Sequence, residues 1–373
     1  MKFTSALPLA FALGASLSAC SSDPAAPAGV SGSSGTNAGA GAGTVAGSGG
    51  QSSSTAGSAG QVSTSGGAAG ASAGATGAAG SSTGGSGGGA AGAGGGGGAT
   101  GGGGAGATFW GPNGPKKQWS CPAGPFPAQT KSAATNICTG FTYNYQYNEG
   151  PTWIASQNAF FFSNFTQGSD LGGDIIKYTI GGACEVWLHD VKCNGLGVSP
   201  SGNLLGSCQG PRAVMEYDVT TKVGRPVASM AGGKLLDSPN DLIARSDGNV
   251  YFSNTTFELG NRPQGLGNAL VRIDPKGVVS VIEAGGLNGV ALSPDETKLY
   301  VVGKGVFSLD AAGVPTKAAG QDPGGDGIAV DCAGTISITG TNSAFGGPDG
   351  KTLIAVGGGT AAKTYQMTVP GLP

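Results

Sequence analysis

Five polar residues that each stand directly before a short apolar segment carry oxygen atoms able to bind a cation. These residues are Glu149, Asn194, Asn240, Asn288 and Asp326. Carboxylate and amide oxygens are hard donors, and several of them together suit a hard divalent cation such as Ca²⁺. Asn and Asp next to Gly are also frequent turn residues. We assign that turn role to Asp247, Asp295 and Asp349, which follow an apolar segment instead of preceding one.

The spacing of the five residues indicates the elements that must position them. They recur at steps of 45, 46, 48 and 38 residues, and each is followed by an apolar run, a Gly-containing turn and a second β-rich run. Repeats of about 40–50 residues with short strands are typical of β-propeller blades. The residue that starts the innermost strand of a blade points toward the propeller axis, so oxygen donors from different blades can meet there.

One step of the repeat is too short for a complete blade. A sixth hairpin begins at Asn342, only 16 residues after Asp326, and four strands with their turns do not fit in that space. We therefore predict an all-β, six-bladed β-propeller with a truncated fifth blade. Two alternatives stay open: Asn342 could belong to another strand of the fifth blade, or residues 108–148 could complete that blade.

The N-terminal third of the chain has a different composition. Residues 1–20 combine Lys2 with an apolar run that ends in Leu-Ser-Ala-Cys, which resembles a bacterial lipoprotein signal with Cys20 as the lipidated residue. The next residue, Ser21, favours the outer membrane. Residues 21–107 hold 33 of the 76 glycines and the single charged residue Asp23. We predict a disordered Gly/Ala/Ser-rich tether with a root-mean-square span of about 50 Å.

Residues 108–373 then form the folded domain. Their 18 Lys and Arg residues are balanced by 20 Asp and Glu residues and do not cluster, so we expect no nucleic-acid partner. A single histidine, His189, excludes a multi-histidine metal site, and we expect it to be packed or on the surface. Six cysteines in an exported domain suggest up to three disulfides, for which the short-loop pairs Cys121–Cys138 and Cys184–Cys193 are our candidates. A structural zinc site is the rival use of these cysteines.

Four segments resemble the gluconolactonase and senescence-marker-protein (regucalcin) family of six-bladed propellers. The matching segments are Glu149-Gly150-Pro151, Ser238-Pro239-Asn240-Asp241, Leu287-Asn288-Gly289-Val290 and Gly325-Asp326-Gly327. The resemblance covers residues from about 145 to the C-terminus.

The resemblance implies a metal site and a reaction. It implies that Glu149, Asn240, Asn288 and Asp326 bind one divalent cation, with Ca²⁺ expected and Mg²⁺, Mn²⁺ or Zn²⁺ as alternatives. It also implies hydrolysis of a lactone, in which Asp326 is the general base as well as a ligand and Asn240 contacts substrate and metal. Phe257, Trp153 and Arg262 are unassigned candidates for the pocket rim.

Four positions depart from the family pattern. Gln209 stands where many relatives have His, Asn254 stands where Asp is usual, and Gly303 occupies a place that is often acidic. Ser343 replaces the residue expected to pair with Cys332, which leaves that thiol unpaired or paired with Cys208.

Three functions follow as hypotheses. The first is a monomeric, divalent-metal-dependent hydrolase acting on sugar lactones or related esters, lipid-anchored in the bacterial cell envelope, with the outer membrane as the expected site. The second is a non-catalytic, metal-containing propeller that binds a ligand or a protein partner. The third is a propeller similar to strictosidine synthase, which does not need the four metal ligands.

Overall fold

The computed structural model describes residues 109–112, 114–167, 172–359 and 361–373. The predicted signal peptide (1–20), the tether (21–107) and Cys20 lie outside these residues, so those predictions stay predictions. No helix in the described part of the chain is long and apolar enough to cross a membrane.

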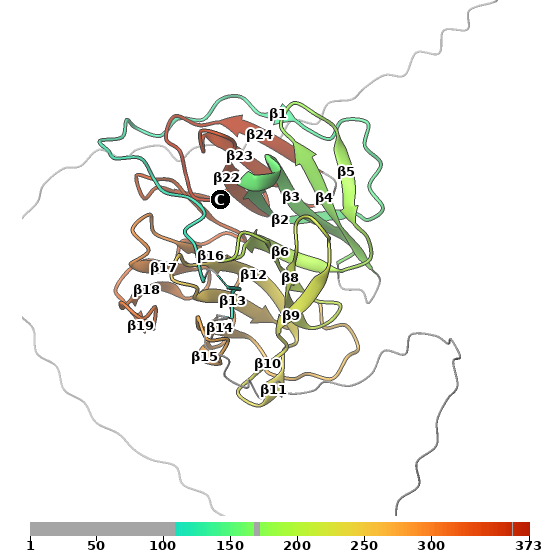
Figure 1. Ribbon diagram of the computed structural model, residues 1–373, viewed down its shortest axis with the longest axis vertical. Helices are drawn as coiled ribbons and strands as arrows, with labels where there is room; N and C mark the ends of the chain where they lie inside the picture. The colour runs from blue at the N-terminus through green and yellow to red at the C-terminus, as the bar shows by residue number, and fades with distance from the viewer. Residues whose placement is uncertain (1–108, 113, 168–171, 360) are drawn as a thin grey trace, which may run out of the picture. The chain divides into compact units, whose positions relative to one another are not determined.

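Five four-stranded antiparallel sheets account for most of the described residues (Figure 1). The first contains β2 (Tyr147–Ile154), β3 (Ala159–Phe165), β4 (Gly173–Thr179) and β5 (Cys184–Leu188), with a 3₁₀ turn (Ala155–Gln157) after β2. The second contains β6 (Cys193–Val198), β7 (Leu204–Cys208), β8 (Ala213–Tyr217) and β9 (Gly224–Ala228). The third contains β12 (Ser238–Ala244), β13 (Val250–Thr255), β14 (Ala269–Ile273) and β15 (Val279–Ala284). The fourth contains β16 (Val290–Leu292), β17 (Lys298–Val301), β18 (Gly305–Leu309) and β19 (Pro315–Lys317).

The fifth four-stranded sheet joins the two ends of the domain. It contains β22 (Asn342–Gly346), β23 (Thr352–Val356) and β24 (Ala362–Gln366), and its outermost strand is β1 (Thr135–Asn136), which pairs with β24. Two short ladders complete the described strands: β10 (Met230–Ala231) with β11 (Lys234–Leu235), and β20 (Ala329–Val330) with β21 (Ile336–Ser337). The segment before β2 therefore adds its strand to the last sheet and not to the β20–β21 ladder.

The first strands of the repeats contact one another in a closed series. β2 contacts β6, β6 contacts β12, β12 contacts β16, β16 contacts β20, β20 contacts β22, and β22 returns to β2. Figure 1 labels β2, β6, β12, β16 and β22 near the middle of the domain, with the later labelled strands of their sheets farther out. This arrangement is a β-propeller with five four-stranded blades, and it confirms the predicted all-β class.

Apolar side chains fill the spaces between neighbouring blades. In β3, Phe160 and Phe162 pack against the last sheet, while Phe161 packs against the second sheet. Alternate residues of a strand point to opposite faces, and each blade is covered on both faces, which explains the continuous Phe run. Another cluster, which includes Trp110, joins the second and third sheets, and the Trp110 Nε1 donates a 2.7 Å hydrogen bond to the Gly248 carbonyl.

The cysteine pairs differ from the predicted ones. All six cysteines of the domain form disulfides, but the pairs are Cys121–Cys332, Cys138–Cys184 and Cys193–Cys208. The pairings Cys121–Cys138 and Cys184–Cys193 were therefore wrong, as were both options for Cys332. Short sequence separation was a poor guide because the segment before β2 crosses several blades: β1 pairs with β24, while Cys121 reaches the turn between β20 and β21.

Candidate active site

The polar residues that precede the inner strands lie at irregular points of the sheets. The pairing shifts between Glu149 and Thr152 in β2, between Cys193 and Leu196 in β6, and between Pro239 and Leu242 in β12. Such β-bulges place an extra residue in one strand and redirect side chains. The bulge repeats in three blades and accounts for the placement of Glu149, Asn194 and Asn240, whereas the strand pairings that follow Asn288 and Asp326 are regular.

Glycines after these residues allow neighbouring blades to approach closely. A Cβ atom on Gly150 would lie 2.3 Å from the Cα of Gly195, and its φ of +48° is one that side-chain-bearing residues rarely adopt. A Cβ on Gly327 would lie 2.1 Å from the side chain of Asn342. These glycines are thus needed for blade-to-blade contact in addition to any role in a turn.

Glu149 is a buried carboxyl group at the start of β2. Its side chain accepts the N–H of Gly150 at 3.2 Å. The pKa of Glu149 is raised from 4.5 to about 8, chiefly by burial. The negative charges of Asp326 and Asp241 contribute to this rise, and hydrogen bonds from Thr341 and Gly150 oppose it. Glu149 therefore lies within electrostatic reach of two other carboxylates that come from different blades.

Asp326 precedes β20 and lies close to two of the predicted ligands. Burial raises its pKa, and a hydrogen bond with the side chain of Asn288 acts in the opposite direction. The backbone also joins the two segments, because the N–H of Gly289 donates to the Asp326 carbonyl at 3.0 Å. Glu149, Asn288 and Asp326 thus form a connected group drawn from three positions far apart in the sequence.

Asn240 reaches this group less directly. It is buried in the bulge of β12, and its backbone carbonyl faces Gly195 of the preceding blade. The contacts that link β12 to the other ligand-bearing segments run through the next residue, Asp241. Its Oδ1 accepts the N–H of Leu242 at 2.9 Å, and its Oδ2 accepts the N–H of Val290 at 3.2 Å.

Asp241 is a residue that the sequence reasoning missed. Burial raises its pKa to about 7 despite hydrogen bonds from Val290 and Leu242, with Asp326 raising it and Asn342 lowering it. A signal was present in the sequence, because the residue after Glu149, Asn194, Asn288 or Asp326 is glycine, whereas Asn240 is followed by an acid. The sequence motif contains this acid, but the motif alone does not indicate its role.

The donor set fits a hard divalent cation. It consists of carboxylate and amide oxygens, and the carboxylates are buried near one another, an arrangement that a bound dication would stabilise. Within the described residues, no three His, Cys, Asp or Glu side chains are placed to hold a metal ion on their own. Amide oxygens from Asn240 and Asn288 would therefore have to complete the coordination.

His189 and the three candidates for the pocket rim lie outside the group of predicted ligands. His189 is an exposed surface residue whose Nδ1 lies 3.3 Å from Asp174. Trp153 is buried against Phe160, and Phe257 is 53% exposed. The Arg262 guanidinium donates to backbone carbonyls in two loops, those of residues 209–210 and 258–259.

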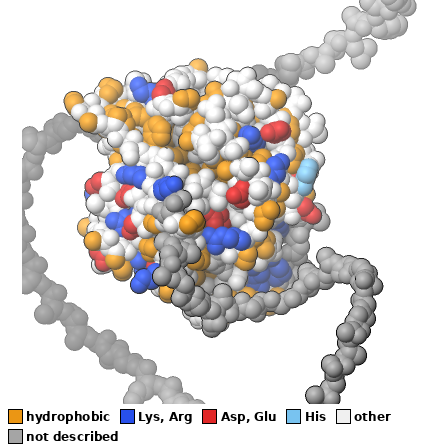
Figure 2. Space-filling view, in the orientation of Figure 1, with side chains coloured by type: hydrophobic (Ala, Val, Ile, Leu, Met, Phe, Trp, Pro, Cys, Tyr) orange, Lys and Arg blue, Asp and Glu red, His pale blue; other side chains and the backbone are white. Residues whose placement is uncertain are grey.

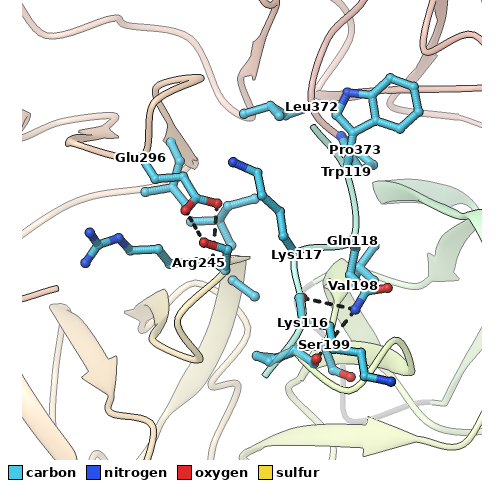
Figure 3. Close-up of a pocket in the computed structure, with 15 residues that line it drawn as sticks. Lys116, Lys117, Gln118, Trp119, Val198, Ser199, Arg245, Glu296, Leu372 and Pro373 are labelled. Atoms are coloured by element: carbon cyan, nitrogen blue, oxygen red, sulfur yellow. Dashed lines mark hydrogen bonds between the residues drawn. The ribbon is translucent and has the colours of Figure 1, made fainter. Parts of the chain in front are cut away.

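A separate cavity lies at the opposite ends of the inner strands. Figure 3 shows it between the loops that follow β6, β12 and β16, with the Lys117 side chain extending into it and Leu372 and Pro373 on one side. The Glu296 carboxylate in this cavity accepts hydrogen bonds from Ser246. None of the four predicted ligands lines the cavity, so the candidate site is at the end where the inner strands begin.

Comparison with known families agrees with this geometry. Residues 147–344 match the family described as the SMP-30/Gluconolactonase/LRE-like region. The chain belongs to this family. The matched range includes Glu149, Asn240, Asn288 and Asp326, so all four candidate ligands lie within the SMP-30/gluconolactonase region.

Individual members share part of the chain or its fold. A gluconolactonase of Zymomonas mobilis is 34% identical over 194 residues, which are 46% of this chain and 54% of the relative. The chain thus spans about half the length of this curated relative. The structure of a Xanthomonas campestris gluconolactonase matches with a TM-score of 0.52 at 22% identity, covering 67% of this chain and 100% of that one. Regucalcin of Agrobacterium tumefaciens, described as a calcium-binding protein, matches with a TM-score of 0.50 at 18% identity, covering 64% and 95%.

Two departures from the SMP-30/gluconolactonase pattern have different surroundings. Asn254 is buried and structural: its Oδ1 accepts the N–H of Asp237 and its amide donates to the Gly267 carbonyl. Gln209 is fully buried, and neither atom of its side-chain amide has a hydrogen-bond partner among the described residues.

Proposed function

We propose that this protein is a divalent-metal-dependent hydrolase that opens sugar lactones or related esters. The observation that carries the proposal is the convergence of Glu149, Asn288 and Asp326 within a propeller of the SMP-30/gluconolactonase family. The gluconolactonase relatives support the lactone substrate, and calcium binding by regucalcin supports Ca²⁺ as the cation, with Mg²⁺, Mn²⁺ or Zn²⁺ as alternatives.

The roles of the residues follow from their chemistry. Glu149, Asn240, Asn288 and Asp326 would hold the cation, which when bound polarises the lactone carbonyl and stabilises the oxyanion. Deprotonated Asp326 takes a proton from the attacking water. The Asn240 amide orients the substrate carbonyl. The acyl carbon–ring oxygen bond then breaks, the ring oxygen takes up a proton, and an open-chain hydroxy acid is released.

The same proposal includes a sixth, truncated blade. The β20–β21 ladder lies in the closed series between β16 and β22, where a sixth blade would stand, and Asp326 lies three residues before the start of β20. Shortening this blade removes outer strands and keeps the inner strand that positions Asp326. We propose that the fifth of six blades is reduced to these two strands.

Attachment to the cell envelope is also part of the proposal. Lipidation of Cys20 would place a monomeric domain at the outer membrane on the tether of residues 21–107. Figure 2 shows basic and acidic side chains interspersed on the visible face of the domain. Partition of the full chain into detergent, and its loss in Cys20→Ser, would test the anchor.

The enzymatic proposal is tested by lactone hydrolysis followed in a pH-stat. Asp326→Ala should abolish Ca²⁺-dependent acid release, whereas Asp349→Ala, which removes an exposed turn carboxylate, should leave it unchanged. Full activity in Asp326→Ala would remove that residue from the mechanism. Metal-dependent stabilisation without hydrolysis by the native protein would support the non-catalytic alternative.

A further inference from the structure

Three tyrosines at alternate positions line one cavity beside the candidate active site. The cavity measures about 610 Å³, which is within the range of small-molecule binding sites. The polar groups of its described side chains are neutral: the amides of two glutamines and the hydroxyls of one threonine and three tyrosines. The side chains that define this tyrosine cavity are Tyr143, Tyr145, Gln146, Tyr147, Thr166 and Gln167.

The tyrosine cavity is lined in part by β2, the strand that carries Glu149. Tyr147 is the first residue of β2, and Glu149 follows two positions later, so both side chains leave the strand on the same side. The Tyr147 ring packs against Phe165, with ring centroids 5.8 Å apart, and its backbone pairs with Gly359. A ligand in the cavity would therefore lie next to the proposed reaction centre.

The segment that carries the tyrosines is held in place before any ligand binds. The Asn164 side chain accepts the N–H of Tyr145 at 3.0 Å and donates to the carbonyls of Tyr145 and Tyr147 at 3.1 and 3.2 Å. The Tyr143 ring packs edge-on against Phe141, with centroids 4.8 Å apart. Because the rings are half-buried and their backbone is fixed, little conformational freedom is left to lose on binding.

The chemistry of the lining favours an uncharged ligand with both apolar and hydroxyl-bearing surfaces. Aromatic rings offer large apolar faces with a polar group at one end, and amides pair with hydroxyl groups as donors and acceptors. Among the described residues that line the cavity there is no Lys, Arg, Asp or Glu, so this lining suits an uncharged ligand better than an ion. A pyranose ring has apolar C–H faces and hydroxyl edges, which match this lining.

We infer that the tyrosine cavity binds a second, glycosidically linked sugar, so that the preferred substrate is the lactone of a disaccharide or longer saccharide. This inference rests on the proposed lactonase function for its catalytic consequence. The binding of a sugar in the cavity does not depend on that function and can be measured separately.

The catalytic test compares glucono-δ-lactone with cellobiono-δ-lactone on the native protein. We expect a kcat/KM about tenfold higher for the disaccharide lactone, as one aromatic contact can supply. Tyr145→Ala should reduce the ratio of the two kcat/KM values to near one. Tyr365→Ala, which alters a half-buried tyrosine on β24 outside the cavity, should leave the ratio unchanged. Equal kcat/KM values for the two lactones in the native protein would overturn the inference.

A binding measurement separates this inference from the proposed function. Cellobiose should bind to the Asp326→Ala protein in calorimetry, and adding Tyr145→Ala should weaken that binding about tenfold. Sugar binding that depends on Tyr145 in a protein whose native form hydrolyses neither lactone would support the cavity and refute the lactonase. Absence of cellobiose binding in both proteins would refute the inference that the tyrosine cavity binds a sugar.

Discussion

Replacing Glu149 by Gln should stabilise the metal-free protein at pH 8, although it removes a candidate metal ligand. The folded protein raises the pKa of Glu149 from 4.5 to about 8, chiefly by burial. Between these two pH values the folded state holds a proton that the unfolded state has released. The contribution of Glu149 to the free energy of unfolding is therefore greatest below pH 4.5 and falls as the pH rises toward 8.

The size of the effect follows from the shift. One pKa unit corresponds to 1.36 kcal/mol, so Glu149 alone should cost about 3 kcal/mol of unfolding free energy between pH 5 and pH 8. Glutamine has nearly the same shape as glutamate and cannot ionise. The Glu149→Gln protein should thus match the native protein near pH 5 and exceed its stability by up to about 3 kcal/mol at pH 8 in EDTA.

Urea unfolding in EDTA at pH 5 and pH 8 would measure this difference, and repeating it with Ca²⁺ would test the metal. Ca²⁺ at 100 times its dissociation constant should stabilise the native protein at pH 8 by about 2.7 kcal/mol, and Glu149→Gln should lose most of that gain. Equal pH dependence of the two metal-free proteins would refute the assigned pKa. Equal stabilisation by Ca²⁺ would refute the role of Glu149 as a ligand.

Three further changes test the packing that supports the site. Gly150→Ala should lower the melting temperature and the Ca²⁺ response, because its Cβ would meet the neighbouring blade, whereas Gly181→Ala, also at positive φ but in open space, should cost less and keep the Ca²⁺ response. Arg212→Ala should lower the free energy of unfolding in urea by about 3–5 kcal/mol, since it leaves the fully buried Asp237 without its 2.8 Å ion-pair partner. A loss below about 1 kcal/mol would mean that the backbone N–H donors to Asp237 are enough to stabilise its buried charge. Replacing both cysteines of the Cys121–Cys332 disulfide, which spans 211 residues, should cost up to about 5 kcal/mol of denaturant stability by the chain-entropy relation, and an unchanged midpoint would contradict it.

The repeat could be predicted from the sequence because the strands of a propeller blade are close to one another along the chain. Each blade is formed by consecutive strands joined by short turns, so the period of polar residue, strand and turn could be read directly. Glu149, Asn288 and Asp326 could be proposed as ligands for the same reason, since each lies at or just before the start of an inner strand. The spacing also predicted a short segment after Asp326, where the described residues form the two-stranded β20–β21 ladder.

Features that depend on contacts between distant segments were not predictable in the same way. The disulfides of Cys121 and Cys138 are set by the path of the segment before β2, which has no repeat of its own. The role of Asp241 depends on the Val290 N–H, 49 residues away. The tyrosine cavity needs Tyr147 beside Gly359, and no period in the sequence relates those two positions.

Hydrolysis of a sugar-lactone panel in a pH-stat tests the metal-dependent reaction most directly. Residues 108–373 are first stripped with EDTA and then supplied with Ca²⁺, Mn²⁺ or Zn²⁺. We expect no enzymatic acid release from the stripped protein and its return with a divalent cation, Ca²⁺ being the first choice. Hydrolysis that is equally fast in EDTA would contradict a metal-dependent reaction. No hydrolysis with any of these cations would contradict the lactonase itself.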